Sequence, residues 1–449
     1  MKHPVVQQLS DFITEYSACS HIYLAYSGGL DSTVLLHALC ETLPNRNLLT
    51  ALHINHNLQS DSSAWVQVCE SQCRALGVDL KVHCLNLASG SHEEERARNG
   101  RYAYFSETLK AGELLLMAHH LNDAVETLLF RLMRGGSSIG LAGIPERRSL
   151  GKGVLHRPFM KLKRAQLEEY ASQNSLEWVQ DPSNRNIQFD RNYIRARVLP
   201  VLLERWPGAL ERLADSIARL GEDSQIIVAW LNEHLDPVLV SRWKLDLGLL
   251  ASYSRAQGPR LLRHWLERCG CFHTTKSQLD EIYRQSLGSD GAKLLFRLSG
   301  SQSAEIGFEY QLRRYRNHLL FCKVYLGELD VSYVWNVQPD LSPQILELPH
   351  GQLLIENNTQ AIRPLALEVR FPIPGQKVHL VSAATPSGHH KSLADLFQQE
   401  GIPSWQRRQY PLVYCSQNLI AIPGVRKFLT GVEGEDPGIF TWHPKQPQS

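Results

Sequence analysis

Short apolar runs alternate with amphipathic segments over the first 135 residues, and this alternation restricts the fold more than any other feature of the chain. Four runs have the length of buried strands: 21–26, 48–54, 79–85 and 114–118. Helical periodicity lies between and after them: 31–42, 61–76, 93–110 and 120–133. Strands that alternate with helices form a mostly parallel sheet covered on both faces, whose ligands bind beyond the carboxyl ends of the strands. Chemistry is therefore expected directly after each of the four strands.

Beyond residue 135 of the 449-residue chain, the regular alternation of apolar runs and amphipathic segments ends. A Gly/Ser-rich stretch and a basic run complete a first part, 1–215, which we expect to be the α/β catalytic domain. Residues 216–325 read as mainly helical, and 330–435 carry Pro, Gly, short β-like runs and one short helix, which predicts a small α+β domain. Residues 436–449 are expected to form a polar tail. About three domains also fit a chain of this length.

Composition excludes several classes of protein. Lys and Arg number 47 against 45 Asp and Glu, so the net charge of +2 does not indicate a partner. The nine cysteines are scattered and form no CxxC pair, which is typical of reduced cytosolic thiols rather than of a zinc or iron–sulfur site. No signal sequence and no run of 18 apolar residues is present, so we expect a cytoplasmic protein without a membrane partner.

The turn after the first predicted strand has the composition of a phosphate-binding loop. Two glycines allow a tight turn and close approach of a ligand, and the start of the next helix offers free N–H groups to an anion. The loop is not a Walker A motif, because the Lys and its spacing are absent. An Asp beside phosphates requires a cation, so Asp31 implies Mg²⁺. The alternative is an ordinary capped turn. The candidate ATP-binding residues are Ser27, Gly28, Gly29, Leu30, Asp31, Ser32 and Thr33.

A second polar group opens the segment 120–133. His119, Asp123 and Glu126 are spaced at i, i+4 and i+7, which places them along one stripe near the start of a helix and toward the crevice. Two carboxylates there suit a cationic amine or a metal. The adjacent histidines lack the HExxH spacing of a zinc site. Surface salt bridges, to Arg131 for example, are the alternative interpretation.

The loop resembles the SGGxDS signature of the N-type ATP pyrophosphatases. This resemblance implies a five-stranded parallel sheet and cleavage of ATP between its α and β phosphates, with adenylylation of a second substrate. The loop alone does not identify that substrate.

Further motifs resemble those of the tRNA(Ile)-lysidine synthetases, in the same order along the chain. Near the C-terminus, 401–407 resembles their small terminal domain. Two departures are Asn57, where the family usually has Gly, and the turn at 388–391, which has His389 and His390 where Gly and Arg are common. The motifs of the first part are His53–His56, Ala97–Tyr102, His119–Thr127, Arg157–Pro158, Asp181–Asn184 and Asp190–Arg195.

The resemblance implies ligation of free L-lysine to C2 of the wobble cytidine in the CAU anticodon of tRNA(Ile), using ATP and Mg²⁺. Asp31, Asp123, Glu126 and Arg98 would be catalytic, with Asp31 on the metal. His53 and Asn55 would join the loop in binding ATP. Arg191 and Arg195, four residues apart, would reach either the lysine carboxylate or a tRNA phosphate. The residues expected to bind substrate are His119, Asp123, Glu126, Arg101, Arg191 and Arg195.

Local charge agrees with an RNA partner although the overall charge does not. Residues 145–205 hold twelve Arg and Lys against seven Asp and Glu. Basic and aromatic residues also interleave over 310–323. Such side chains neutralise phosphates and stack on unpaired bases. A solvated helix face is the alternative for the second group.

Three other functions are weighed against this one. A tRNA thiolase of the same superfamily would need reactive cysteines or an iron–sulfur cluster, which the scattered cysteines do not favour. A GMP or NAD synthetase would not need the basic run at 145–205 or two further domains. A silent RNA-binding protein would have little need for Asp31, Asp123 and Glu126 together. The oligomeric state stays open, with a homodimer as one option.

Overall fold

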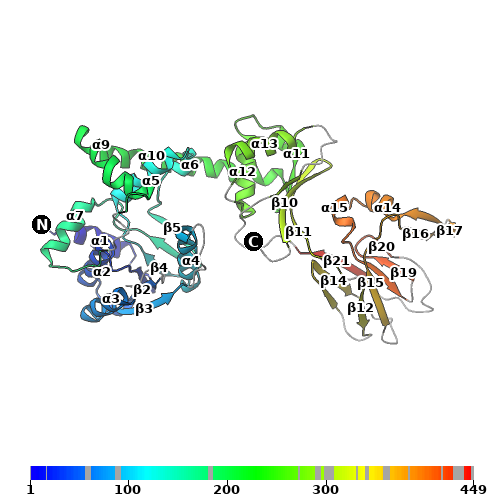
Figure 1. Cartoon of the computed structure of the whole chain (residues 1–449), viewed down its shortest axis with the longest axis horizontal. Coiled ribbons are helices and arrows are strands. Elements are labelled where there is room, and N and C mark those ends of the chain that lie inside the picture. Colours follow the sequence, from blue (N-terminus) through cyan, green and yellow to red (C-terminus); the bar gives the residue numbers. More distant parts are fainter. Residues whose placement is uncertain are drawn as a thin grey trace. The chain divides into compact units, whose positions relative to one another are not determined.

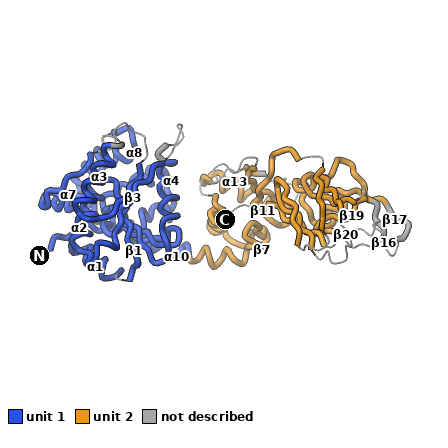
Figure 2. The backbone as a smooth tube through the Cα atoms, turned by 90° about the horizontal axis from the view of Figure 1, so that it is seen from below, with its two compact units in different colours: residues 1–228 blue, residues 229–449 orange. Residues whose placement is uncertain are grey.

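The structure of the chain is a computed structural model whose contacts divide it into two compact units, residues 1–228 and 229–449 (Figure 2). The description below covers these residues: 2–16, 18–55, 62–85, 93–180, 186–271, 274–288, 295–297, 308–329, 332–338, 343–356, 365–382, 385–415, 418–427 and 439–445.

The four predicted strands and two further ones form one sheet in the first unit, in the order β3-β2-β1-β4-β6-β5 (Figure 1). Within the described residues, five strands run parallel and the edge strand β5 runs antiparallel to β6. The expected five-stranded parallel sheet is confirmed, with one further strand at its edge. The strands are β1 (His21–Ala25), β2 (Leu49–Asn55), β3 (Asp79–Cys84), β4 (Glu113–Leu116), β5 (Arg147–Leu150) and β6 (Gly153–His156).

Helices cover both faces of this sheet. Successive strand residues point to opposite sides, so each strand contributes side chains to two cores. Ile22 and Leu24 of β1 belong to the core beneath one set of helices, whereas Tyr23 belongs to the core beneath α4 (Glu93–Thr108). Both cores are apolar, which explains the continuous hydrophobic runs of the strands. The helices of the first set are α1 (Pro4–Glu15), α2 (Leu30–Thr42), α3 (Ser62–Leu76) and α7 (Arg164–Gln173).

A group of helices packs beyond the carboxyl end of β4. Val125 and Leu128 of α5 (Leu121–Met133) share a core with Leu199 and Leu210. This packing carries residues 190–205 back to the start of α5. The other elements here are α6 (Ser138–Leu141), α8 (Asp190–Tyr193), a π-helical turn (Ile194–Val198), α9 (Leu199–Arg205) and the start of α10 (Ala209–Leu235).

The hairpin of β5 and β6 was not expected from the basic run that contains it. Gly151 turns this hairpin with a φ of +57°, and a Cβ there would lie 2.1 Å from the carbonyl oxygen of Ser106. Each strand is only four residues long. Such short runs, rich in arginine in β5, do not stand out as strands.

The middle part of the chain contains the expected helices and also a sheet that was not expected. The sheet has the order β7-β8-β11-β10-β9. Its central pair forms a hairpin, with Tyr315 opposite His318. The helices are α11 (Leu247–Ala251), α12 (Gly258–Arg268) and α13 (Lys276–Ser286). The strands are β7 (Leu239–Ser241), β8 (Lys244–Asp246), β9 (Leu295–Arg297), β10 (Phe308–Tyr315) and β11 (His318–Tyr325). A 3₁₀ turn at Asp236–Val238 precedes β7, and another lies in the first unit at Arg46–Leu48.

The C-terminal part is the expected α+β arrangement. One sheet has the order β12-β15-β18-β19-β20, a second β13-β14-β21 and a third β16-β17. The helices are α14 (Leu393–Gln399) and α15 (Ser404–Arg407). The strands are β12 (Ser332–Val337), β13 (Gln344–Leu348), β14 (Gly351–Glu356), β15 (Leu365–Arg370), β16 (Lys377–Ser382), β17 (Thr385–Ser392), β18 (Leu412–Cys415), β19 (Asn418–Ile422), β20 (Arg426–Lys427) and β21 (Ile439–Pro444).

Two expectations for this part were wrong. The expected tail at 436–449 contains β21, whose Phe440 is buried and pairs with Ile355 of β14. The expected turn at 388–391 lies within β17, where His390 pairs with His379 of β16. Cross-strand pairing organises both segments, and polar composition did not reveal it.

Candidate active site

The loop after β1 is held together by its own hydroxyl groups. The Ser27 and Ser32 Oγ atoms lie 3.0 Å apart, and Ser32 Oγ donates to the carbonyl oxygen of Gly29 at 3.0 Å. Gly29 precedes α2 without a side-chain cap, so the first N–H groups of that helix keep their capacity for an anion. The predicted residues Ser27 to Thr33 therefore form a preorganised cradle at the start of α2.

Gly28 is required at its position for two reasons. Its φ is +76°, which L-residues rarely adopt, and a Cβ there would lie 2.7 Å from the Sγ atom of Cys69. Val179 donates its N–H to the Gly28 carbonyl oxygen at 2.9 Å. The loop is thus supported from α3 and from the segment after α7.

Asp31 lies in the first turn of α2 with a carboxylate oxygen to spare. Its Oδ1 atom is buried and accepts no hydrogen bond from the described residues. Burial raises the pKa of Asp31, and His120 opposes that shift. A hard oxygen donor without a partner, beside a phosphate cradle, suits Mg²⁺. The described residues contain no cluster of three or more metal-ligating side chains, so phosphate oxygens and water would complete the coordination.

His120 lies between Asp31 and Asp123. Its Nδ1 atom accepts the N–H of Asp123 at 3.4 Å, and Asp123 Oδ2 accepts the N–H of His120 at 3.0 Å, which caps α5 at both residues. Because Nδ1 is an acceptor, the proton of the neutral ring is on Nε2. That atom lies 3.7 Å from Asp31 Oδ1. His120 therefore connects the phosphate loop with the carboxylates of α5, although sequence reasoning selected only its neighbour His119.

The carboxylates of α5 are paired with arginines. Glu126 is 1% exposed, and both of its oxygens accept hydrogen bonds from Arg195 at 2.7 Å. Asp123 Oδ1 accepts from Arg191 at 3.1 Å and from Arg195 at 3.3 Å. The structure thus brings four predicted site residues together, with the arginines on the carboxylates themselves. The π-helical turn Ile194–Val198 contains Arg195, and such turns are frequent at functional sites.

Two titrating groups at this point are shifted by their surroundings. Burial lowers the pKa of His119 to about 4, so this ring is neutral at pH 7. Burial alone would raise the pKa of Asp123, but His120, His119 and Arg191 outweigh burial and hold it below the ordinary value. Asp123 is therefore an ionised carboxylate across the physiological range.

The remaining predicted residues lie around this centre. His53 is buried at the end of β2, where its Nδ1 atom is 3.0 Å from the carbonyl oxygen of Tyr26, and Asn55 is buried two residues later. Arg98 and Arg101 lie on α4, next to Tyr102. The motif residues His56, Asn57 and 181–184 lie outside the described residues.

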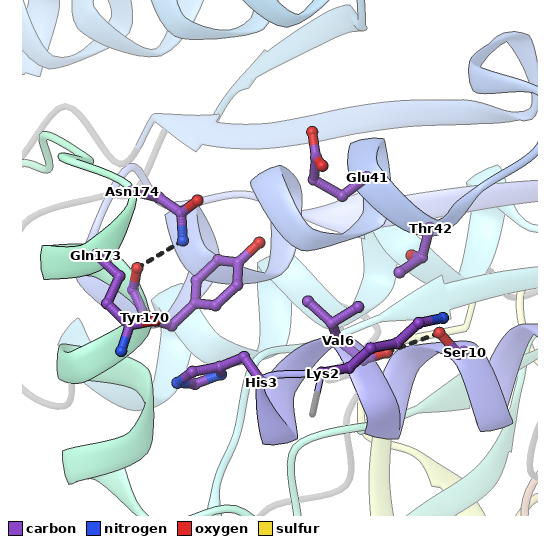
Figure 3. A pocket seen from close by; sticks show the side chains of 9 residues that line it. All are labelled: Lys2, His3, Val6, Ser10, Glu41, Thr42, Tyr170, Gln173 and Asn174. Carbon is purple, nitrogen blue, oxygen red and sulfur yellow. Dashed lines mark hydrogen bonds between the residues drawn. The ribbon is translucent and has the colours of Figure 1, made fainter.

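A separate cavity of about 430 Å³ lies at the other end of α2 and contains none of these residues (Figure 3). Glu41 and Thr42 line it from the last turn of α2, opposite the loop at the helix start. Tyr170 of α7 also lines it and lies 3.0 Å from His37 Nδ1. The predicted site is therefore the crevice at the strand ends and not this cavity.

Comparison with known proteins agrees with this geometry. Three family models match: a PP-loop domain over 1–202, a TilS substrate binding domain over 245–320 and a TilS substrate C-terminal domain over 367–439. The tRNA(Ile)-lysidine synthase of Serratia proteamaculans is 33% identical over 441 residues, which cover 96% of this chain and 97% of that protein. The same enzyme of Pseudomonas fluorescens is 33% identical, over 92% of this chain and 90% of that protein. The chain belongs to the tRNA(Ile)-lysidine synthase family.

A tRNA(Ile)-lysidine synthase is a ligase, so the chain is an enzyme of this class, and its PP-loop domain supports the use of ATP. Among solved structures, the U34-tRNA thiolase NcsA from Methanococcus maripaludis has a TM-score of 0.40 and 15% identity, covering 49% of this chain and 79% of that one. That likeness is too low to bear on activity. No helix among the described residues is long and apolar enough to span a membrane.

Sequence reasoning did not select several residues that the structure places around the candidate site. Cys69 supports Gly28 from a helix 41 positions later, and nothing in its sequence context indicates this contact. Tyr102 and Arg157 occur in the matched motifs but were given no role. Arg148 lies in the unexpected strand β5. Only Tyr102, which directly follows Arg101 in one motif, had a signal in the sequence.

Proposed function

We propose that the protein ligates free L-lysine to C2 of the wobble cytidine, position 34, in the CAU anticodon of tRNA(Ile). An adenylylated cytidine would be the intermediate, and AMP and pyrophosphate the products, so that the tRNA reads AUA instead of AUG. The observation that supports this proposal most is the position of the His120 ring. Its Nε2 atom lies 3.7 Å from Asp31 Oδ1, and its Nδ1 atom lies 3.5 Å from Asp123 Oδ2. A phosphate cradle and a carboxylate centre in one crevice suit a reaction that joins an activated base to an amine.

The first step is the attack of the cytidine oxygen on the α-phosphorus of ATP. The loop 27–33 holds the β and γ phosphates through its hydroxyl groups and the free N–H groups of α2. Asp31 would hold Mg²⁺, whose charge would stabilise the negative charge that builds on the pyrophosphate leaving group. His120 keeps Asp31 aligned with the start of α5.

The second step is the attack of the lysine amine on C2, with AMP as the leaving group. Asp123 is ionised, and its Oδ1 atom accepts a hydrogen bond from Arg191, whose side chain is 44% exposed. Arg195 is held by both oxygens of Glu126. Arg191 is thus the arginine that can turn toward the lysine carboxylate, and this movement leaves Asp123 to accept the ammonium group and its proton.

The tRNA would also contact the second unit. We assign residues 216–325 and 330–435 to tRNA binding, next to a catalytic part at 1–215, in agreement with the family models for substrate domains. The basic and aromatic group at 310–323 lies on the hairpin of β10 and β11, where Arg313 stacks on Trp405 of α15, 5.0 Å from the ring centroid. Basic and aromatic side chains together suit single-stranded or looped RNA. The cytoplasmic location and the homodimer stay predictions.

The competing thiolase function finds no support in the two cysteines nearest the loop, Cys69 and Cys73. Burial raises the pKa of Cys69 and of Cys73 to about 12, so neither thiol forms a thiolate readily. All nine cysteines are free thiols. A sulfur-carrying mechanism needs a reactive thiolate or a cluster.

Incubation of the full-length protein with ATP, radiolabelled lysine and bulk tRNA tests the proposal. Label is expected in the RNA, in a nucleoside at the wobble position, and its appearance should require ATP. RNA without label, or label that appears without ATP, would refute the assignment. Sulfur incorporation in a parallel reaction would select the thiolase instead.

A further inference from the structure

A group of cationic side chains at the crevice forms no ion pair within the described part of the chain, and the function proposed above assigns it no role. Arg98 and Arg101 of α4, Arg148 of β5 and Arg157, directly after β6, surround the ring of Tyr102. We call these four residues the arginine cluster. The Cζ atoms of Arg148 and Arg98 lie 4.8 and 5.9 Å from the Tyr102 ring centroid, and Arg157 Nη2 donates to the Tyr102 hydroxyl oxygen at 3.5 Å.

None of the four arginines forms an ion pair with a carboxylate of the described residues. Arg157 is only 3% exposed, its Nη1 atom donates to the carbonyl oxygen of Pro145 at 2.6 Å, and its Nε atom has no partner. The Nε atom of Arg101 is likewise buried without a partner. Burying a guanidinium group without a counter-charge is costly, so structures normally pair it. The pairs around Glu126 show that this crevice does so elsewhere.

Electrostatics at neighbouring groups agrees with the geometry. Burial lowers the pKa of both Arg101 and Arg157. Burial raises the pKa of Tyr102, but the four arginines outweigh it and bring the pKa below its ordinary value. These residues thus form a region of positive potential that lacks its anion.

The position of the cluster favours a polyanion over a second nucleotide. At its inner end, Arg101 and Arg157 act on His119, beside the carboxylate centre. At its outer end, Arg148 is exposed on β5, the edge strand of the sheet. ATP already has a cradle at the end of β1, two strands away from β6 in the sheet. A chain of phosphates that enters from the sheet edge would meet the whole cluster, whereas an enclosed nucleotide would meet only its inner end.

We propose that the arginine cluster is a subsite for the RNA backbone and binds a phosphate adjacent to the cytidine that reacts. Arg157 and Arg101 would donate hydrogen bonds to the phosphate at the inner end. Arg148 would contact the RNA backbone where it enters from the edge of the sheet. Arginine suits this role because its fork donates two parallel hydrogen bonds to a phosphate. The inference rests on the proposed function, in which RNA is the substrate.

Arg148→Gln tests the subsite in the full-length protein, with Arg147→Gln as the matched control. Both residues are exposed on β5, and strand alternation turns them to opposite faces, where Arg147 lies over Tyr16. Each substitution removes one positive charge from the same strand. The Kd for tRNA is measured by filter binding over a range of salt concentrations, and the Kd for ATP by calorimetry.

We expect Arg148→Gln to weaken tRNA binding about tenfold and to lower the slope of log Kd against log salt by about one, as for the loss of a phosphate contact. Arg147→Gln should change neither by as much, and ATP binding should stay as in the wild type for both. Equal tRNA binding by the two variants would overturn the inference. Weaker ATP binding with unchanged tRNA binding would assign the cluster to an ATP phosphate and overturn it as well.

Tyr102→Phe separates the charge of the cluster from the hydroxyl group at its centre. This change removes the acceptor of Arg157 and keeps all four charges, so the salt slope should stay unchanged. A lower slope for Tyr102→Phe would contradict a role for the arginines themselves. Lysine incorporation by the wild type is measured beside these assays. Its failure would remove the proposed function, whereas normal incorporation with no difference between Arg148→Gln and Arg147→Gln would remove only the subsite.

Discussion

Replacement of Arg195 by Ala should destabilise α5, because it removes the main partner of a buried carboxylate on this helix. The side chain of Glu126 is 1% exposed and accepts two hydrogen bonds of 2.7 Å from Arg195. Arg191 is the other described cation at this carboxylate, and its Nε atom is 3.5 Å from Oε2. Arg195→Ala would therefore leave a buried carboxylate with one weak partner.

The magnitude follows from the burial of the two partners. Removal of one member of a buried ion pair costs about 3–5 kcal/mol. Arg195 is 31% exposed, so water can enter the vacated space, and we expect the lower end, about 3 kcal/mol. Glu126→Gln should cost less, about 1 kcal/mol, because the amide oxygen still accepts one hydrogen bond. The double variant should be about 2 kcal/mol more stable than Arg195→Ala, since it buries no unpaired charge.

Hydrogen exchange of the backbone amides of residues 124–132 measures this effect where it arises, without assuming that two units unfold together. A loss of about 3 kcal/mol raises the exchange of protected amides in α5 about a hundredfold. Peptides from α12 in the second unit serve as the internal control. If Arg195→Ala leaves α5 protected as in the wild type, or if the double variant exchanges faster than Arg195→Ala, the pair does not hold the helix.

Three further changes test individual groups of the crevice. Asp31→Ala should keep the fold and lose tRNA-dependent pyrophosphate release, because it removes the unpaired oxygen beside the loop; near-normal release would contradict the metal role. Asp123→Asn should raise the KM for lysine more than that for ATP, and an unchanged lysine KM would argue against an ammonium site. The free energy of unfolding should fall as pH drops from 6.5 to about 4. In this range His119 is protonated in the unfolded chain but not in the folded protein, where its pKa is about 4. His119→Asn should show a smaller loss between pH 7 and 5 in urea unfolding, and an equal loss would exclude this cause.

The parallel sheet and its loop were predictable because their signals are local. The central strands β1, β2 and β4 are largely apolar runs, and the Ser27–Thr33 loop follows β1 directly. Buried parallel strands and phosphate loops need those residue types in that order, whatever the rest of the chain does. Helix periodicity likewise identified α5 and its inward stripe.

The partners of that stripe were not predictable. Arg191 and Arg195 lie 68 and 69 residues from the carboxylates they contact in α5, Asp123 and Glu126 respectively. Their spacing of four indicated that they share a helix face. Which residues this face contacts depends on how residues 190–205 pack on α5. The hairpin of β10 and β11 was missed for a different reason. Residues 308–312 do alternate apolar and polar side chains, which is the period of two of a strand, but this alternation lasts only five residues before the arginines at 313 and 314 interrupt it.

The near-neutral composition also concealed how charge is distributed at the crevice. Arg191 and Arg195 are matched by Asp123 and Glu126, although the four residues are far apart in sequence. The arginine cluster, on α4, on β5 and directly after β6, has no such match among the described residues. Composition counts both groups alike, because pairing is a property of the fold and not of the chain. The positive potential that remains after pairing is what an anionic substrate would meet, and for that reason a net charge of +2 is compatible with binding both ATP and RNA.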